Sequence, residues 1–236
     1  MQPDTRYIER RGQIEHYFDR TAVQAWERLT STAPVGRIRA TVRAGRDRMR
    51  ENLLSWLPHR MDGLRLLDAG CGTGALAQIA AERGAHVIAI DLSPTLVNLA
   101  QERHRLAGHA MMGRIDFRSG DMLDEALGEF DHVVGMDSLI HYDTPDIVQA
   151  LARLSQRTRS SMLFTFAPRT PLTAVAHRLG RLFPRSDRSP SLEPQSESVL
   201  REALVARLGP QGWQEGRTER VVSGFYTSQA WEWKRG

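Results

Sequence analysis

Apolar residues recur at helical spacing in the first quarter of this chain and form short strand-like runs after it. Residues 6–30 and 35–57 carry apolar side chains three or four positions apart, which predicts two helices, the second ended by Pro58. From residue 64 onward, short apolar runs alternate with helical segments. The expected strands are 64–67, 87–90, 115–117, 130–136 and 162–167, and the expected helices are 75–83, 94–106 and 146–157. This alternation predicts right-handed βαβ units and a parallel sheet.

The alternation is interrupted after residue 167. Residues 168–195 are expected to form an insertion, with an amphipathic stretch and a turn-rich run. A helix at 196–208 follows, and then two strands near 217–222 and 224–233. Because so few residues separate these two strands, we expect them to pair antiparallel. The pattern as a whole predicts a doubly wound, Rossmann-like α/β sheet with an antiparallel last strand.

The length of 236 residues fits a single domain. We expect this domain to span the whole chain in four parts. These are N-terminal capping helices (1–60), a cofactor-binding core (61–167), a substrate-covering insertion (168–195), and a C-terminal helix and strands that complete the sheet (196–236).

Composition narrows the class of protein. No apolar run approaches the ~20 residues that cross a bilayer, and the N-terminus is polar with no signal-like stretch, so we expect a cytoplasmic protein. Cys71 is the single cysteine, which excludes an intramolecular disulfide and a thiolate zinc cluster. The net charge is only +4, but the arginines are concentrated in residues 37–50 and 169–188.

The glycine-rich run Asp68-Ala69-Gly70-Cys71-Gly72-Thr73-Gly74 follows an expected strand and opens an expected helix. Its backbone N–H groups therefore lie at a positive helix end, where a ligand can approach the main chain closely. The spacing is Gly-x-Gly-x-Gly, whereas a dinucleotide site has Gly-x-Gly-x-x-Gly around a pyrophosphate. A nicotinamide dehydrogenase is therefore disfavoured.

Three carboxylates near this loop indicate which ligand it binds. Asp68 ends its strand where it could receive the amino group of a methionine moiety, and Asp91 ends the next strand where it can accept both ribose hydroxyls. Asp121 follows the third strand, where it can accept an adenine amino group. Together these groups predict an S-adenosylmethionine site and a class I methyltransferase form of the fold. Cys71 is expected to be a small packing residue there rather than a nucleophile.

The expected cofactor-binding residues come from the loop, from the ends of strands and from the first helix. They are Tyr17, Asp68, Gly70, Cys71, Gly72, Gly74, Asp91, Leu92, Asp121, Met122 and Met136. No protein-bound metal is expected.

The acceptor is expected beyond the fourth strand, because ligands of open parallel sheets bind at the carboxyl ends of the strands. The run Met136–Tyr142 stands at that place, so His141 and Tyr142 should lie near the transferred methyl group. His141 can act as a base or orient an acceptor, and the alternative is a structural histidine. Tyr17-Phe18 of the first helix could cover the cofactor, with core packing as the alternative.

Several blocks of sequence resemble the magnesium-protoporphyrin IX O-methyltransferase family of (bacterio)chlorophyll synthesis. The blocks span nearly the whole chain. They are His16–Thr21 with Trp26, Val42–Arg46, Asp68–Gly74, Met136–Tyr142, Leu182–Pro190 and Val222–Tyr226. The glycine loop is shared by many methyltransferases, whereas the N-terminal, Phe-Pro-Arg-Ser and Gly-Phe-Tyr blocks are far more particular.

The resemblance implies methyl transfer from S-adenosylmethionine to a propionate of Mg-protoporphyrin IX, which gives the monomethyl ester and S-adenosylhomocysteine. It implies that His141 and Tyr17 are catalytic and orient the carboxylate. It also implies that Arg43, Arg46, Tyr142 and Arg185 bind the substrate, the alternative for the arginines being a solvated helix face. The magnesium belongs to the porphyrin. A handover complex with the porphyrin-binding subunit of magnesium chelatase and peripheral contact with the photosynthetic membrane are further implied.

Two other functions stay open at this point. The first is a small-molecule O-methyltransferase for a phenol or quinone precursor, which would need a true general base because a phenol has a pKa near ~10. The second is a nucleic-acid-binding protein such as an RNA methyltransferase. The small net charge and the lack of an appended RNA-binding module argue against it, and the absence of an Asn-Pro-Pro-Tyr-like run disfavours methylation of amide or base nitrogens.

Overall fold

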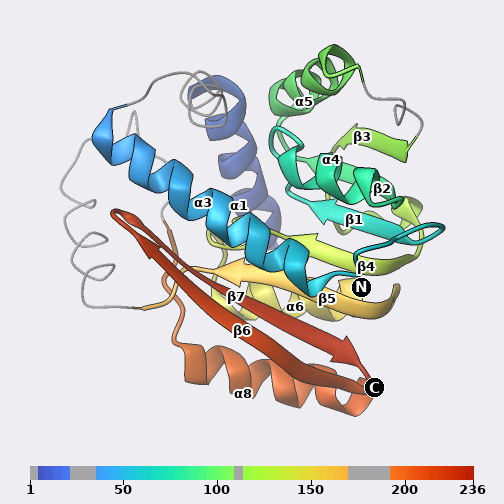
Figure 1. Ribbon diagram of the computed structural model, residues 1–236. Coiled ribbons are helices and arrows are strands. Elements are labelled where there is room, and N and C mark those ends of the chain that lie inside the picture. Colours follow the sequence, from blue (N-terminus) through green and yellow to red (C-terminus); the bar gives the residue numbers. More distant parts are fainter. Residues whose placement is uncertain (1–4, 22–35, 109–113, 170–191) are drawn as a thin grey trace.

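The computed structural model describes residues 5–21, 36–108, 114–169 and 192–236. Within these residues lies a seven-stranded sheet in the order β3-β2-β1-β4-β5-β7-β6 (Figure 1). The strands are β1 (Arg65–Ala69), β2 (His86–Asp91), β3 (Ile115–Ser119), β4 (Phe130–Gly135), β5 (Thr158–Phe166), β6 (Trp213–Ser223) and β7 (Tyr226–Arg235). Strands β1 to β5 are parallel, and β7 is antiparallel to both β5 and β6. The predicted doubly wound sheet with an antiparallel last strand is confirmed.

Helices cover both faces of the sheet. They are α1 (Thr5–His16), α3 (Arg37–Trp56), α4 (Ala75–Glu82), α5 (Pro94–Leu106), α6 (Thr144–Ser155) and α8 (Glu197–Leu208), with a π-helical turn η1 (Tyr17–Thr21) directly after α1. The N-termini of two helices are set by capping residues in the local sequence. Ser93 caps α5, where its hydroxyl accepts the Leu96 N–H at 3.2 Å, and Asp143 caps α6, where its carboxylate accepts the Asp146 N–H at 3.1 Å. A proline stands within the first two positions of each helix: Pro94 in α5 and Pro145 in α6.

Side chains alternate between two core clusters along the central strands, as the period of a strand requires. On β1, for example, Leu67 lies in the cluster covered by α6 and α8, whereas Leu66 lies in the cluster covered by α3 and α4. Val133 and Val134 of β4 divide in the same way. Both faces of these strands are therefore buried, which explains why they read as short continuous apolar runs.

Several element bounds differ from the sequence prediction. Strand β5 begins at Thr158, four residues before the expected 162. Strand β6 begins at Trp213 rather than near 217, because backbone hydrogen bonds to β7 extend an edge strand whose exposed positions are polar. Helix α6 begins at Thr144, two residues early, because Asp143 supplies its cap. The helix expected over 6–30 is α-helical only to His16 and continues as the π turn, and its remainder lies outside the described residues.

The parallel strands bring their carboxyl ends to one edge of the sheet. Helix α1 and the N-terminal half of α3 lie over this edge (Figure 1). Of the insertion predicted to cover the substrate (168–195), only residues 168–169 and 192–195 are described, and the rest lies outside the described residues. None of the described helices has the length and apolar character needed to cross a membrane.

Candidate functional site

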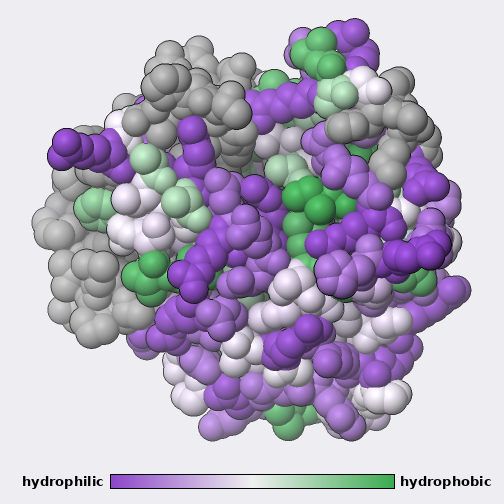
Figure 2. All heavy atoms as spheres, in the orientation of Figure 1, coloured by the Kyte–Doolittle hydropathy of each residue, from purple (hydrophilic) through white to green (hydrophobic). Residues whose placement is uncertain are grey.

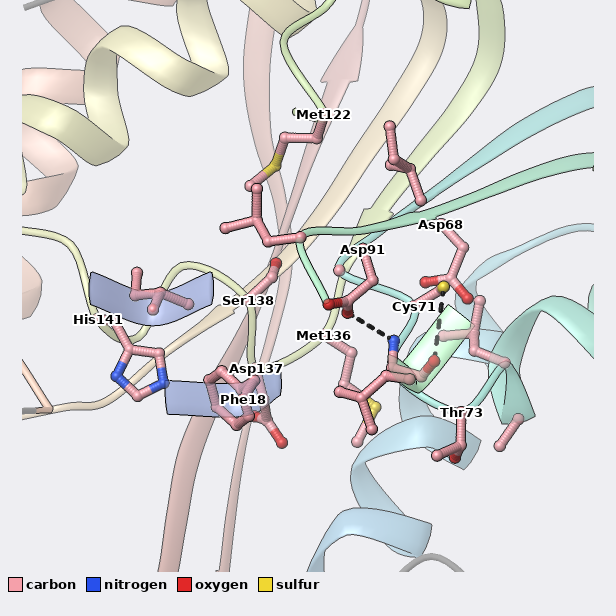
Figure 3. Close-up of a pocket in the computed structure, with 18 of the residues that line it drawn as sticks. Phe18, Asp68, Cys71, Thr73, Asp91, Met122, Met136, Asp137, Ser138 and His141 are labelled. Atoms are coloured by element: carbon pink, nitrogen blue, oxygen red, sulfur yellow. Dashed lines mark hydrogen bonds between the residues drawn. The ribbon is translucent and has the colours of Figure 1, made fainter. Parts of the chain in front are cut away.

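A cavity of about 550 Å³ lies at the carboxyl ends of the parallel strands. Its wall comes from the loops after β1, β2, β3 and β4, and from one face each of α1 and α3. The lining residues that bear on function are Phe18, Arg43, Arg46, Arg50, Asp68, Gly70, Cys71, Gly72, Asp91, Leu92, Met122, Met136, Asp137, Ser138, His141 and Tyr142. Figure 3 shows Asp68 and Asp91 on one side of this cavity and Phe18, Asp137 and His141 on the other.

The glycine loop turns sharply from β1 toward α4. The N–H groups of Gly70 and Cys71 both donate to the Ile90 carbonyl, at 2.8 and 3.0 Å, which ties the loop to β2. Gly70 has φ +86°, and a Cβ there would lie 2.4 Å from the Cβ of Ser138. Gly74 caps α4 with φ +78°, and its missing side chain makes room for the Phe117 ring. Gly70 thus lines the cavity, whereas Gly74 packs behind it.

Two buried carboxylates stand beside the loop. Asp68 is 2% exposed and accepts the Ala77 N–H at 3.1 Å. Burial raises the pKa of Asp68 to about 7, and the neighbouring Asp91 adds to the rise while the Ala77 N–H opposes it. Asp91 accepts the N–H groups of Gly72 at 2.8 Å and Ser93 at 3.0 Å, and burial raises its pKa as well. Ionising these two groups costs free energy that a positively charged ligand would offset.

Cys71 lines the cavity and packs against the core beneath α4. Burial raises the pKa of its thiol well above the usual value, and the charges of Asp68 and Asp91 add to this rise. The thiol is therefore protonated at neutral pH, which fits a packing residue and does not fit a nucleophile.

Asp121 does not line the cavity, although its neighbour Met122 does. Its carboxylate accepts from the Tyr7 hydroxyl at 3.1 Å, from Arg11 Nη1 at 2.9 Å and from the Leu123 N–H at 2.9 Å. Helix α1 is thereby tied to the end of β3. An adenine amino group that donated to Asp121, as predicted, would therefore share the carboxylate oxygens with Tyr7 and Arg11 of α1.

The first helix presents Phe18 to the cavity rather than Tyr17. Tyr7, Ile14 and Phe18 line the wall, and their spacing places them on one helical face. Tyr17 is half-buried and touches the Phe18 ring edge at a centroid distance of 5.2 Å. The sequence predicted Tyr17-Phe18 as a cover of the cofactor and only Tyr17 as a contact, whereas Phe18, four positions after the apolar Ile14, is the one of the two that lines the cavity.

Helix α3 presents charged residues along the face that meets the cavity. Arg43, Arg46, Asp47 and Arg50 are spaced three and four positions apart and all line the wall. The structure thus brings the predicted Arg43 and Arg46 to the cavity. Arg46 donates to Asp137 at 2.7 Å, and Arg50 pairs with Asp47 at 2.7 Å. The predicted Arg185 lies outside the described residues.

The loop after β4 carries the predicted acceptor-side residues. His141 is 5% exposed, lines the cavity and meets the Phe18 ring edge at 5.8 Å between ring centroids. Its backbone carbonyl accepts from Arg10 Nε at 2.7 Å, and Arg10 also pairs with Glu193 at 2.8 Å. Tyr142 also reaches the wall, but its ring is stacked on Tyr7 in the core at 5.3 Å. The histidine backbone is thus fixed independently of its side chain.

Two polar residues of this loop were not predicted as site residues. Asp137 has a left-handed backbone, and Ser138 places a buried hydroxyl in the wall that has no hydrogen-bond partner in the described part of the chain. No pattern in the sequence marks either of them. In the same described part, no group of three or more histidine, cysteine, aspartate or glutamate side chains is arranged to hold a metal ion.

Two family descriptions match the chain. Residues 66–161 match a methyltransferase domain, and residues 135–235 match the C-terminus of magnesium-protoporphyrin IX methyltransferase. The magnesium-protoporphyrin O-methyltransferase of Rhodobacter capsulatus is 45% identical over 229 residues, which cover 97% of this chain and 98% of that protein.

Other relatives are more distant. The crystal structure of magnesium protoporphyrin IX methyltransferase from Synechocystis PCC 6803 with bound SAH matches with a TM-score of 0.81 and 28% identity, over 94% of this chain and 98% of that one. A ubiquinone biosynthesis O-methyltransferase of Xanthomonas oryzae pv. oryzae is 39% identical, but over only 56% of this chain and 58% of its own length. The magnesium-protoporphyrin methyltransferases are thus matched over nearly the whole chain, whereas the ubiquinone biosynthesis O-methyltransferase is matched over only part of it.

Proposed function

Because this chain belongs to the magnesium-protoporphyrin O-methyltransferase family, we propose how its cavity performs that reaction. The chain is an S-adenosylmethionine-dependent O-methyltransferase that acts on a propionate of Mg-protoporphyrin IX and gives the monomethyl ester, a step of (bacterio)chlorophyll synthesis. The observation that carries this function is the 45% identity over 97% of the chain, which includes both sides of the cavity.

The residues present fit the methyl donor. Asp68 and Asp91 are buried carboxylates with raised pKa, a set that suits a ligand with an ammonium group and ribose hydroxyls. The open face of Gly72, where a Cβ would meet nothing within 4 Å, leaves room for it along the loop. When bound, the donor supplies an electrophilic methyl group on a positive sulfur. Among the predicted contacts, we propose Asp68 for the amino group and Asp91 for the ribose.

Asp68 gives this proposal a pH dependence. Its folded-state pKa of about 7 lies above the ~3.9 of an exposed aspartate, so the free energy of unfolding falls as pH rises from about 4 to about 7 and is level above that. A bound cation favours the ionised form. S-adenosylhomocysteine should therefore bind roughly tenfold more tightly at about pH 7 than at about pH 5.5, with release of a proton.

Calorimetry in buffers of different ionisation enthalpy measures both quantities. Asp68→Asn can keep the bond from the Ala77 N–H and should bind with little pH dependence, whereas Asp116→Asn, at an exposed ion pair, should behave as wild type. An unchanged pH dependence in Asp68→Asn would remove Asp68 from the cofactor site.

The acceptor side needs orientation more than activation. A propionate has a pKa near ~4.3, so it is already ionised at neutral pH and its negative oxygen attacks a positive donor. We propose that Arg43 and Arg46 hold the carboxylates, with Tyr142 and Arg185 as further contacts, and that His141 orients the reacting group. The same role predicted for Tyr17 would require its side chain to reach the cavity past Phe18, which lines the wall in its place. Exclusion of water by Phe18 and the α1 face then strengthens these interactions.

We also propose two interactions of this protein, one with another protein and one with a membrane. The substrate is a flat apolar macrocycle, which favours its direct transfer to this chain from the porphyrin-binding subunit of magnesium chelatase. Contact with the photosynthetic membrane is supported by Val222 and Phe225 at the β6–β7 tip, which are 62% and 73% exposed. Figure 2 shows that hydrophilic residues predominate on one face of the molecule, with several separate apolar patches among them. Exposed Arg37 and Arg39 lie close to Thr41, whose carbonyl accepts from Ser223 of this tip.

Cosedimentation with anionic vesicles tests the membrane contact. The wild-type chain should pellet with them, and the Val222→Ser/Phe225→Ser variant should stay in the supernatant with unchanged methyl transfer. Equal pelleting of both proteins would exclude the tip as the contact.

The function itself is tested by methyl transfer from labelled S-adenosylmethionine to competing acceptors. Mg-protoporphyrin should be methylated, metal-free protoporphyrin more slowly, and a dihydroxybenzoate of the quinone-precursor type not at all. Preferred transfer to the phenol would support the second candidate, which rests on the partial match to ubiquinone biosynthesis enzymes.

A further inference from the structure

Asp137 occupies an unusual place at the cavity. It follows the end of β4 and has φ +55°, the one non-glycine residue with positive φ in the described part of the chain. An L-residue adopts this conformation only where its surroundings hold it there. The Asp137 N–H donates to Thr165 Oγ1 of β5 at 2.7 Å, which fixes the backbone at that point.

The Asp137 carboxylate joins three elements. It accepts from the Tyr226 hydroxyl at 3.1 Å and Ser228 Oγ at 3.2 Å, both on β7, and from Thr165 Oγ1 at 3.2 Å on β5. Burial raises the pKa of Tyr226, and the charge of Asp137 raises it further, so that this hydroxyl stays protonated and donates. The carboxylate is thus held in place by the sheet.

The fourth donor to Asp137 comes from α3. Arg46 Nη1 donates to Asp137 Oδ2 at 2.7 Å, and the two side chains are 20% and 5% exposed. A guanidinium is a rigid planar fork, so holding one N–H restricts the directions in which the other four can point. Next to Arg46, a Cβ on Gly45 would lie 2.5 Å from Tyr226 Cδ1, which shows how closely α3 is seated on the same tyrosine.

We propose that Asp137 is a positioning residue that holds the Arg46 guanidinium at the cavity wall in the orientation that receives a substrate propionate. This inference rests on the proposed function, which places a propionate at Arg46. Both residues line the same cavity, so an Arg46 oriented by Asp137 remains within reach of its contents. A mobile arginine would recognise the planar carboxylate less well, because paired hydrogen bonds depend on the angle of the fork.

The test compares two ligands that differ only in free carboxylates: Mg-protoporphyrin and its dimethyl ester. Binding is followed by quenching of protein fluorescence in wild type, Arg46→Gln, Asp137→Asn and the double variant. Asparagine tolerates the left-handed backbone and can still accept from Tyr226, so Asp137→Asn removes chiefly the charge that faces Arg46.

The wild type should prefer the diacid by roughly tenfold, and both single variants should lose most of that preference. The double variant should lose no more than Arg46→Gln alone, because Asp137 acts through Arg46. Affinity for S-adenosylhomocysteine and kcat should change by less than about twofold, whereas KM for Mg-protoporphyrin should rise about tenfold. Arg48→Gln, on the exposed face of α3, should match wild type throughout.

Tyr226→Phe provides a second route if Asp137→Asn folds poorly. It removes one donor to Asp137 and keeps the ring against Gly45, and it should reduce the preference by about threefold. An undiminished preference for the diacid in Asp137→Asn or Tyr226→Phe would overturn the inference, whether or not the melting temperature falls. Absence of methyl transfer to Mg-protoporphyrin by the wild type would instead overturn the proposed function.

Discussion

Replacement of Gly70 with alanine should weaken cofactor binding by roughly a hundredfold, or about 2.7 kcal/mol. The added Cβ would lie 2.4 Å from the Cβ of Ser138, and φ of +86° is unfavourable for alanine. The Ser138 Cβ is attached directly to the backbone, so it cannot move aside as the end of a flexible side chain could. The unfavourable φ can be relieved only by moving the backbone. The loop would have to shift, although the Gly70 N–H is bound to the Ile90 carbonyl at 2.8 Å.

Gly63→Ala is the matched control for backbone strain. Gly63 has φ +76°, but a Cβ there would meet nothing within 4 Å, and the residue does not line the cavity. It should lower the melting temperature slightly and leave cofactor affinity unchanged. Calorimetric titration with S-adenosylhomocysteine measures both variants. Affinity of Gly70→Ala within about threefold of wild type would show that the loop is not the cofactor cradle.

Replacement of His141 with alanine should lower turnover about tenfold or more while cofactor affinity stays nearly constant. The side chain lines the acceptor side of the cavity, whereas the proposed cofactor contacts come from the loops after β1 and β2. The loop should keep its place, because Arg10 binds the His141 backbone carbonyl and not the ring. His141→Asn can still donate a hydrogen bond to a carboxylate and should recover part of the loss.

The dependence on pH separates a carboxylate acceptor from a phenol. Turnover of wild type and both variants is measured from about pH 6 to about pH 10 at saturating cofactor. An ionised propionate needs no base, so neither variant should be rescued at high pH. Equal collapse of both variants with rescue near pH 10 would indicate a phenol acceptor, and full activity in both would make His141 structural.

Local sequence was sufficient for the parts of the site that rest on short-range geometry. A glycine loop between a strand and a helix places Gly70 and Asp68 at the carboxyl edge of a parallel sheet whatever the rest of the chain does. Gly70 and Asp68 could therefore be predicted from position alone. Arg43 and Arg46 share a helical face by spacing, but their choice as substrate residues came from the family resemblance.

Other features depend on contacts between distant segments. Asp121 is engaged by Tyr7 and Arg11, more than a hundred positions earlier, and Asp137 by residues of α3, β5 and β7. The length of β6 is set by its hydrogen bonds to β7 rather than by apolar alternation. Such partners are absent from any local window of sequence.

The most direct test of the proposed reaction is to locate the transferred methyl group. Labelled S-adenosylmethionine and Mg-protoporphyrin IX are incubated with the wild-type enzyme, and the pigment is isolated and analysed by mass spectrometry before and after mild alkali. We expect a single added methyl group that alkali releases as methanol, as an ester of a propionate requires. A methyl group that resists alkali, or a pigment without label while a phenolic acceptor is methylated, would contradict the proposed reaction.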